Sequence, residues 1–127
     1  MKLILLVIAF FYLPFGQKSE VPFSKIETAF VKKDAIGLSK MGNDKLLISL
    51  FGKESVYSSQ QSAQALKKMF NEYPIQSFKF IFKGKENQEG SFAIASYTTK
   101  NSKLRITFHF KKSRSTYKIV RMNVERE

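Results

Sequence analysis

The chain has 127 residues and a formal net charge of +12, with one His and no Cys. Its length allows a single domain, and the lack of Cys excludes disulfides and a Cys-linked lipid anchor. One His without Cys supplies too few groups for a zinc site or a His-dependent nucleophilic triad. No glycine pattern matches a phosphate-binding loop. We therefore expect no metal site and no cofactor.

The first 16 residues have the pattern of a secretory signal peptide. Lys2 provides the positive start, and the apolar run from Leu3 to Phe15 is shorter than the roughly 20 residues that span a membrane. Cleavage after Gly16 would leave residues 17–127 as one exported domain, periplasmic or secreted. Pro14 fits the position three residues before that cut poorly, so an uncleaved N-terminal anchor stays an alternative.

The positive charge indicates which partners to expect. Loss of residues 1–16 removes one cation and lowers the net charge from +12 to +11. The remaining Lys and Arg are dispersed, and no nucleic-acid-binding motif accompanies them. We expect the partner to be an acidic envelope protein, an anionic glycan or a membrane surface, and we consider nucleic acid unfavoured.

Two helices are predicted near the start of the exported domain. Phe23, Ile26, Ala29 and Phe30 recur at helical spacing after Pro22. Asp34 can cap a second, shorter helix that runs to Met41, and Gly42 with Asn43 is expected to close it in a left-handed conformation.

The middle of the chain predicts a buried strand, a turn, a short strand and one well-marked helix. The strand is expected over residues 44–50, the turn over 52–54 and the short strand over 55–57. Ser58 and Gln61 have the spacing of a capping box, and Pro74 ends the helix that follows. Its apolar residues Leu66, Met69 and Phe70 are expected to pack in the core; a helix-in-groove partner site is the alternative.

The rest of the chain predicts four strands, over about 75–83, 92–99, 104–111 and 116–125. Apolar and polar residues alternate with period two, which is typical of half-buried antiparallel strands. Helices before and strands after indicate an α+β domain.

This order of elements resembles the nuclear transport factor 2-like, or cystatin-like, cone superfamily. More narrowly, several stretches of the mature chain carry a family resemblance: 26–41, 56–58, 64–65, 69–70, 78–80 and 104–106. They are similar to a family of exported bacterial proteins known only as domain of unknown function 4783 (DUF4783). The resemblance implies a curved antiparallel sheet of four to five strands wrapped around two or three helices, and it transfers no catalytic residue.

The strand pattern divides the sheet residues between two faces. We expect the inner face to be a filled core rather than a pocket, because its residues are nearly all apolar. These core or pocket residues are Phe70, Phe78, Phe80, Phe82, Phe92, Phe108 and Phe110. The opposite face is predicted to be basic and to carry Lys79, Lys83, Lys103, Arg105, His109 and Lys111.

Three functions follow from these expectations. The first is a non-enzymatic binding module of the cell envelope that uses the basic face, as a monomer or a homodimer. The second is binding of a small apolar ligand in the cone. The third is acid–base catalysis in the cone, for which the candidate groups are Tyr57, Tyr97, Tyr117 and Glu72.

Overall fold

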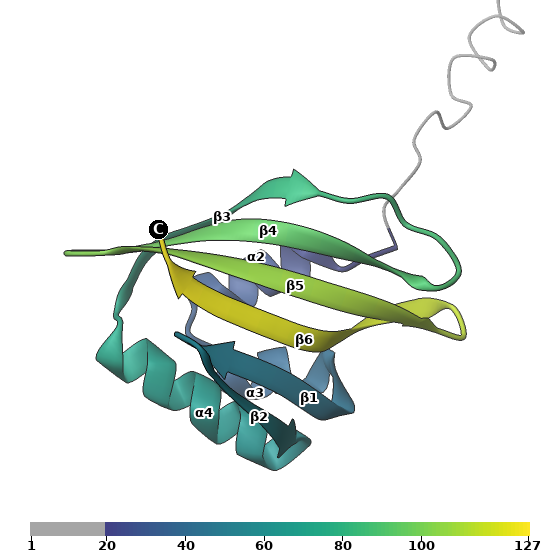
Figure 1. Ribbon diagram of the computed structural model, residues 1–127, viewed down its shortest axis with the longest axis horizontal. Helices are drawn as coiled ribbons and strands as arrows, with labels where there is room; N and C mark the ends of the chain where they lie inside the picture. The colour runs from purple at the N-terminus through teal and green to yellow at the C-terminus, as the bar shows by residue number, and fades with distance from the viewer. Residues whose placement is uncertain (1–19) are drawn as a thin grey trace, which may run out of the picture.

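A computed structural model describes residues 20–127, so the predicted signal peptide lies outside the described residues. The described chain forms one curved, open sheet with three helices on one of its faces (Figure 1). This confirms the predicted α+β class. The elements in chain order are α2 (Phe23–Val31), α3 (Ala35–Lys40), β1 (Gly42–Leu50), β2 (Lys53–Ser58), α4 (Ser59–Glu72), β3 (Ile75–Lys83), β4 (Gly90–Thr99), β5 (Lys103–Ser113) and β6 (Thr116–Arg126).

The sheet has six strands in the order β2-β1-β6-β5-β4-β3. The last four strands form the predicted antiparallel meander. The six strands agree with the strand pattern of the sequence and exceed the four to five that the family resemblance implied. One neighbouring pair, β1 with β6, is parallel. Period-two patterns identify strands but not their partners. The partner of β1 here is β6, the last strand of the chain.

The short helix α3 begins as predicted and ends differently. The Gly37 N–H donates to Asp34 Oδ1 over 2.9 Å, which is the expected N-cap. Gly42 is not left-handed, however, and already belongs to β1. The Ile119 N–H donates to the Met41 carbonyl oxygen over 2.9 Å, so pairing with β6 takes over where the helix stops.

Helix α4 has both halves of the predicted capping box. The Gln61 N–H donates to Ser58 Oγ over 3.2 Å, and the Ser58 N–H donates to Gln61 Oε1 over 3.0 Å. Leu66, Met69 and Phe70 are buried against the rest of the domain. These three side chains therefore pack in the core, as predicted, and are not free to insert into a groove of a partner protein.

The turn between β1 and β2 lies one residue earlier than predicted. Phe51 and Gly52 have φ angles of 51° and 89°, so both central residues are left-handed, as in the two-residue type I′ hairpin. Lys53 and Glu54, expected in the turn, are the first residues of β2.

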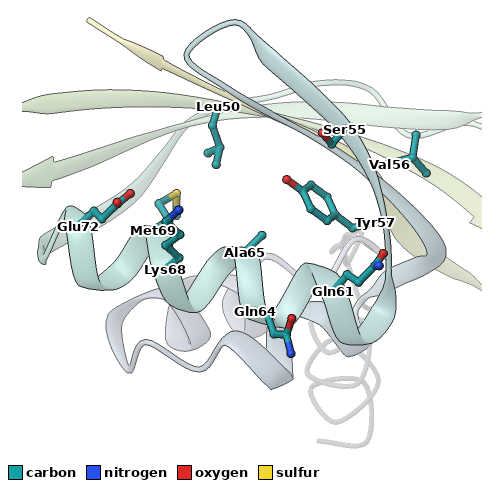
Figure 2. A pocket seen from close by; sticks show the side chains of 10 residues that line it. All are labelled: Leu50, Ser55, Val56, Tyr57, Gln61, Gln64, Ala65, Lys68, Met69 and Glu72. Carbon is teal, nitrogen blue, oxygen red and sulfur yellow. The ribbon is translucent and has the colours of Figure 1, made fainter.

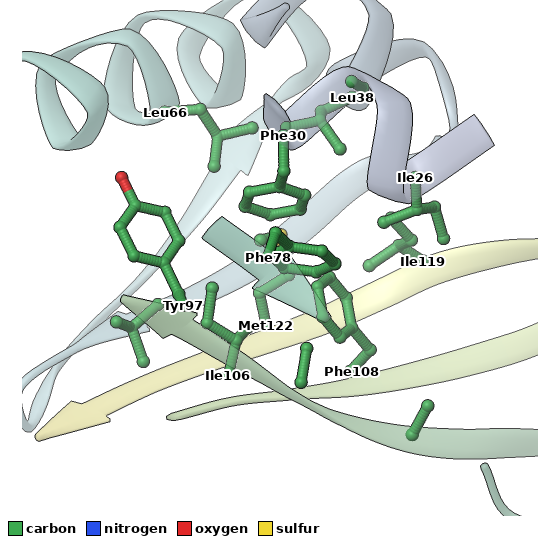
Figure 3. Packing of buried hydrophobic residues seen from close by; sticks show 14 of the residues in the cluster. Ile26, Phe30, Leu38, Leu66, Phe78, Tyr97, Ile106, Phe108, Ile119 and Met122 are labelled. Atoms are coloured by element: carbon green, nitrogen blue, oxygen red, sulfur yellow. The ribbon is translucent and has the colours of Figure 1, made fainter. Parts of the chain in front are cut away.

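An aromatic cluster fills the space between the helices and the sheet. Phe30 is fully buried and lies parallel to Phe78 with ring centroids 4.2 Å apart. Phe108 meets the same ring edge-on at 5.9 Å (Figure 3), and Phe70 does so at 5.7 Å. Such edge-on and offset contacts add to the apolar area that the rings bury. The inside of the cone is therefore filled by its own side chains in this region.

Two of the predicted core residues, Phe82 and Phe92, lie on the opposite face. In β4 the inward positions belong to Ala93, Ala95 and Tyr97, all fully buried. The sequence pattern predicts that the larger apolar residues of β4 occupy its inner face. Rings from other elements already fill that space, however, and leave room only for the methyl groups of the alanines.

A register shift in β3 between Phe80 and Phe82 explains why Phe82 lies on the face opposite the helices. The shift adds one residue to the strand, so Phe82 lies beside Ile94 instead of continuing the inner row of Phe78 and Phe80. Phe82 and Phe92 are 49% and 40% exposed. Sequence periodicity alone does not reveal such a bulge.

Candidate functional site

The first candidate site is the sheet face that no helix covers, called the outer face below. The helices pack against the face that carries the buried Ile106 and Phe108 (Figure 1). Because side chains alternate along a strand, their neighbours Arg105, Thr107 and His109 project to the other side. A sheet face left open in this way is available for binding.

Five of the six predicted basic-face residues share the outer face. Strand register places Lys79 and Arg105 on either side of Ser96, and Lys103 beside Thr98. His109 and Lys111 follow at alternate positions of β5. Cations from β3 and β5 are thereby brought to one surface, as predicted.

Lys83 does not belong to this surface. The register shift in β3 pairs Lys83 with the buried Ala93, on the helix side of the sheet. Its Nζ lies 4.7 Å from the centre of the Phe23 ring of α2, a cation–π contact. The same bulge that moved Phe82 outward therefore moved Lys83 inward.

Acidic groups neutralise only part of the outer face. Arg105 lies 3.7 Å from Glu127, and Arg121 lies 3.4 Å from Glu54. These partners are largely exposed, so each ion pair contributes little stability. Within residues 20–127, Lys79, Lys103 and Lys111 make no ion pair, and their ammonium groups are available to an anion.

His109 and two exposed phenylalanines form an aromatic patch beside these cations. Phe92 lies 5.3 Å from Phe82 and 6.2 Å from His109, measured between ring centroids. Partial burial, followed by the charge of Arg121, lowers the pKa of His109 below its ordinary value of 6.5. The imidazole is thus neutral at pH 7 and adds an aromatic surface rather than a charge. The alternating sequence pattern does not predict this patch, because it places both phenylalanines in the core.

The second candidate site is a cleft between α4 and the β1–β2 hairpin, with a volume of about 570 Å³. Figure 2 shows the hairpin passing over α4, with the Tyr57 ring directed into the space between them. Its walls combine apolar and polar groups, as ligand sites do. The lining residues are Leu50, Ser55, Val56, Tyr57, Gln61, Gln64, Ala65, Lys68, Met69 and Glu72.

The four candidate acid–base groups separate into two pairs. The Tyr97 hydroxyl donates to the Tyr73 carbonyl oxygen, and the Tyr117 hydroxyl donates to that of Asn87 over 2.7 Å. Burial raises the pKa of the Tyr97 phenol above its ordinary value, so it stays protonated as a structural donor. Tyr57 and Glu72 line the same α4 cleft, whereas Tyr117 lines a separate hollow beside Lys25 and Lys118.

Residues 20–127 hold no group of three or more His, Asp or Glu side chains that could bind a metal ion. In the same part of the chain, no helix is both long and apolar enough to cross a membrane.

Residues 23–125 match the model of a family described as a domain of unknown function, DUF4783. Among solved structures, a DUF4783 family protein from Bacteroides ovatus is 25% identical, with a TM-score of 0.79 over 87% of this chain and 98% of that one. A second, from Bacteroides uniformis, is 22% identical, with a TM-score of 0.77 over 84% and 97%.

More distant structures share the fold alone. A ketosteroid isomerase-like protein from Erwinia carotovora atroseptica is 14% identical, with a TM-score of 0.67 over 84% of this chain and 93% of that chain. A domain with a cystatin-like fold from Nostoc punctiforme is 10% identical, with a TM-score of 0.65 over 83% and 72%. Among curated proteins, none matches the chain.

Proposed function

The chain belongs to the DUF4783 family. From this premise we propose that it is a binding module of the cell envelope and that its outer face binds polyanionic partners. The observation that carries the proposal is the placement of Lys79, Lys103 and Lys111, without ion pairs in residues 20–127, on a sheet face that no helix covers. Cations on alternate strand positions meet an extended array of negative groups better than a single small anion.

The aromatic patch next to these cations extends the same surface. Phe82 and Phe92 are exposed, and rings at such a site pack against the apolar parts of a sugar or a lipid headgroup region. The net charge of +12 adds long-range attraction for a negatively charged surface. Like charges on the outer face also oppose its self-pairing, so binding by a monomer is the expected mode.

Export, which we propose from the pattern of residues 1–16, would bring the module to anionic glycans and lipid headgroups. Both present negatively charged oxygens, and they differ in whether the anions belong to a soluble polymer or to a bilayer. The test therefore uses heparin for the first source and phosphatidylglycerol-containing vesicles for the second.

The critical variant reverses four cations of the outer face, with Lys79, Lys103, Arg105 and Lys111 all changed to Glu. Its matched control reverses Lys25, Lys32, Lys40 and Lys67, which are exposed on the helices or directly after one, so both proteins lose the same charge. We expect the outer-face variant to elute from heparin at lower salt, or to lose vesicle binding, by clearly more than the control. Equal effects of the two variants would mean that net charge alone drives binding, and the proposal would fail.

The cone interior is a less favoured place for a small ligand. Phe30, Phe78 and Phe108 occupy the space in which such a ligand would lie, and no observation favours their displacement.

A further inference from the structure

Strand β2 ends the sheet with its outer edge open. It pairs with β1 on one side only, and residues 53–56 and 58 of this strand are exposed, Val56 by 60%. An edge strand presents unpaired backbone N–H and C=O groups, which can pair with another extended chain. This edge is distinct from the outer face considered above.

The hairpin turn determines which backbone groups are free. In a two-residue turn the flanking pair, Leu50 with Lys53, is hydrogen-bonded, and bonded and non-bonded pairs then alternate. The backbone groups of Glu54, Val56 and Ser58 therefore point away from β1. The bond from the Ser58 N–H to Gln61 Oε1 agrees with this assignment. Within residues 20–127, no partner outside the β1 ladder is seen for the backbone of Glu54 or Val56.

The other edge of the sheet, β3, is irregular where β2 is regular. Two register shifts interrupt the pairing of β3, near Ile75 and near Phe80, and bulges of this kind hinder the addition of a further strand. Helix α2 also contacts β3. The six residues of β2, in contrast, pair with β1 without interruption, so β2 is the edge suited to accept a strand.

Helix α4 forms the second wall of a groove along this edge. Gln61, Gln64, Lys68 and Glu72 recur at three- to four-residue spacing and line the cleft together with Ser55, Val56 and Tyr57 of β2. Eleven helical steps from Gln61 to Glu72 cover about 16 Å at 1.5 Å per residue. A strand of five residues covers about the same length at 3.3 Å per residue. The groove therefore has the length of a short extended peptide.

We propose that this groove binds an extended, acidic peptide segment that adds to β2 as a seventh strand. Its backbone would pair with the free N–H and C=O groups of Glu54 and Val56. Every second side chain would point into the cleft, onto Leu50, Ala65 and Met69.

The groove also indicates the composition of the peptide. Its floor is apolar, so the inward side chains should be aliphatic. The helical wall carries one cation, Lys68, and one carboxylate, Glu72, while the carboxylate of Glu54 is held by Arg121 on the outer face. These two wall charges balance, so the preference for a peptide with a net negative charge comes from the net charge of the protein, +12.

Selection from a library of random seven-residue peptides on the purified protein tests the proposal. We expect enriched peptides with aliphatic residues at alternate positions and at least one Asp or Glu. Val56→Pro removes the outward N–H without removing a bond to β1, and Val56→Thr is the matched control that keeps it. Val56→Pro should weaken the binding of the best peptide by about tenfold or more, and Val56→Thr should leave it nearly unchanged.

A second arm does not depend on the folding of a variant. Two versions of the best peptide are compared, each with N-methyl groups on the backbone amides of one of its two edges. Only the version that is methylated on the edge facing β2 should lose binding. Equal loss for both edges, equal binding to the two Val56 variants, or no enriched peptide would overturn the proposal. Concentration-dependent dimerisation abolished by Val56→Pro would also overturn it, because the edge would then serve a second copy of the chain.

Discussion

The inner face of the sheet is covered in different ways at its two ends. At the β3–β5 end, Phe30 packs in the centre of a ring cluster over Ala93 and Ala95, which leave it room. At the β1–β2 end, α4 and the hairpin enclose an open cleft with polar walls. From this difference we expect the first end to contribute most to the stability of the domain and the second to leave room for a ligand.

The largest effect should come from the centre of the filled end. Phe30→Ala removes a fully buried ring and should lower the free energy of unfolding by about 3–5 kcal/mol, measured by urea or guanidinium denaturation. Val31→Ala is the neighbouring control, because Val31 is 58% exposed and should change stability by no more than about 0.5 kcal/mol. Similar losses for both residues would show that the end is loosely packed.

A larger side chain should lower the free energy of unfolding at the filled end of the sheet and leave it nearly unchanged at the open end. Ala95→Leu adds volume where no space is left and should cost about 1–3 kcal/mol of unfolding free energy. Ala65→Leu adds the same atoms to the wall of the open cleft, in a helix that tolerates Leu, and should stay within about 0.5 kcal/mol. Thermal and denaturant unfolding measure both variants. If the cleft were closed in solution, Ala65→Leu would destabilise the protein about as much as Ala95→Leu.

The smallest effect concerns His109 on the outer face. Its pKa is lowered in the folded protein, first by burial and then by Arg121, so the unfolded chain binds the proton more readily. This contribution to stability is complete above the unfolded value of about 6.5 and is lost as pH falls through that value toward the folded pKa. His109→Gln should therefore flatten the pH dependence of stability between about pH 7.5 and 5.5. A dependence identical in both proteins would exclude the histidine as its source.

Much of the fold was predictable from local signals. The capping box of Ser58 and Gln61, the stop at Pro74 and the Asp34 cap act through neighbouring residues. The period-two pattern of β5 also placed Arg105 and Lys103 on one face and Phe108 and Phe110 on the other, because a regular strand leaves no choice once one side is buried.

The errors occurred where a distant element decides the outcome. Phe92 is larger and more apolar than Ala93, so the local pattern favours it for the core. Rings from α2, β3 and β5 already occupy that space and leave only room for a methyl group. The bulge in β3 likewise depends on its pairing with β4, and it exchanged the faces of Phe82 and Lys83.

The cleft and the open edge of β2 could not be predicted from local sequence patterns either, because both depend on contacts between distant elements. Tyr57 and Glu72 were candidates as single groups, but only the packing of α4 beneath the hairpin brings them to one space. By itself, the sequence determined the helices, the strands, the charge and one face of β5, because these depend on residues close in the chain. The tertiary structure alone decided the strand order, the face of β4 and the two candidate surfaces, because these depend on which side chains from distant parts of the chain occupy a given space.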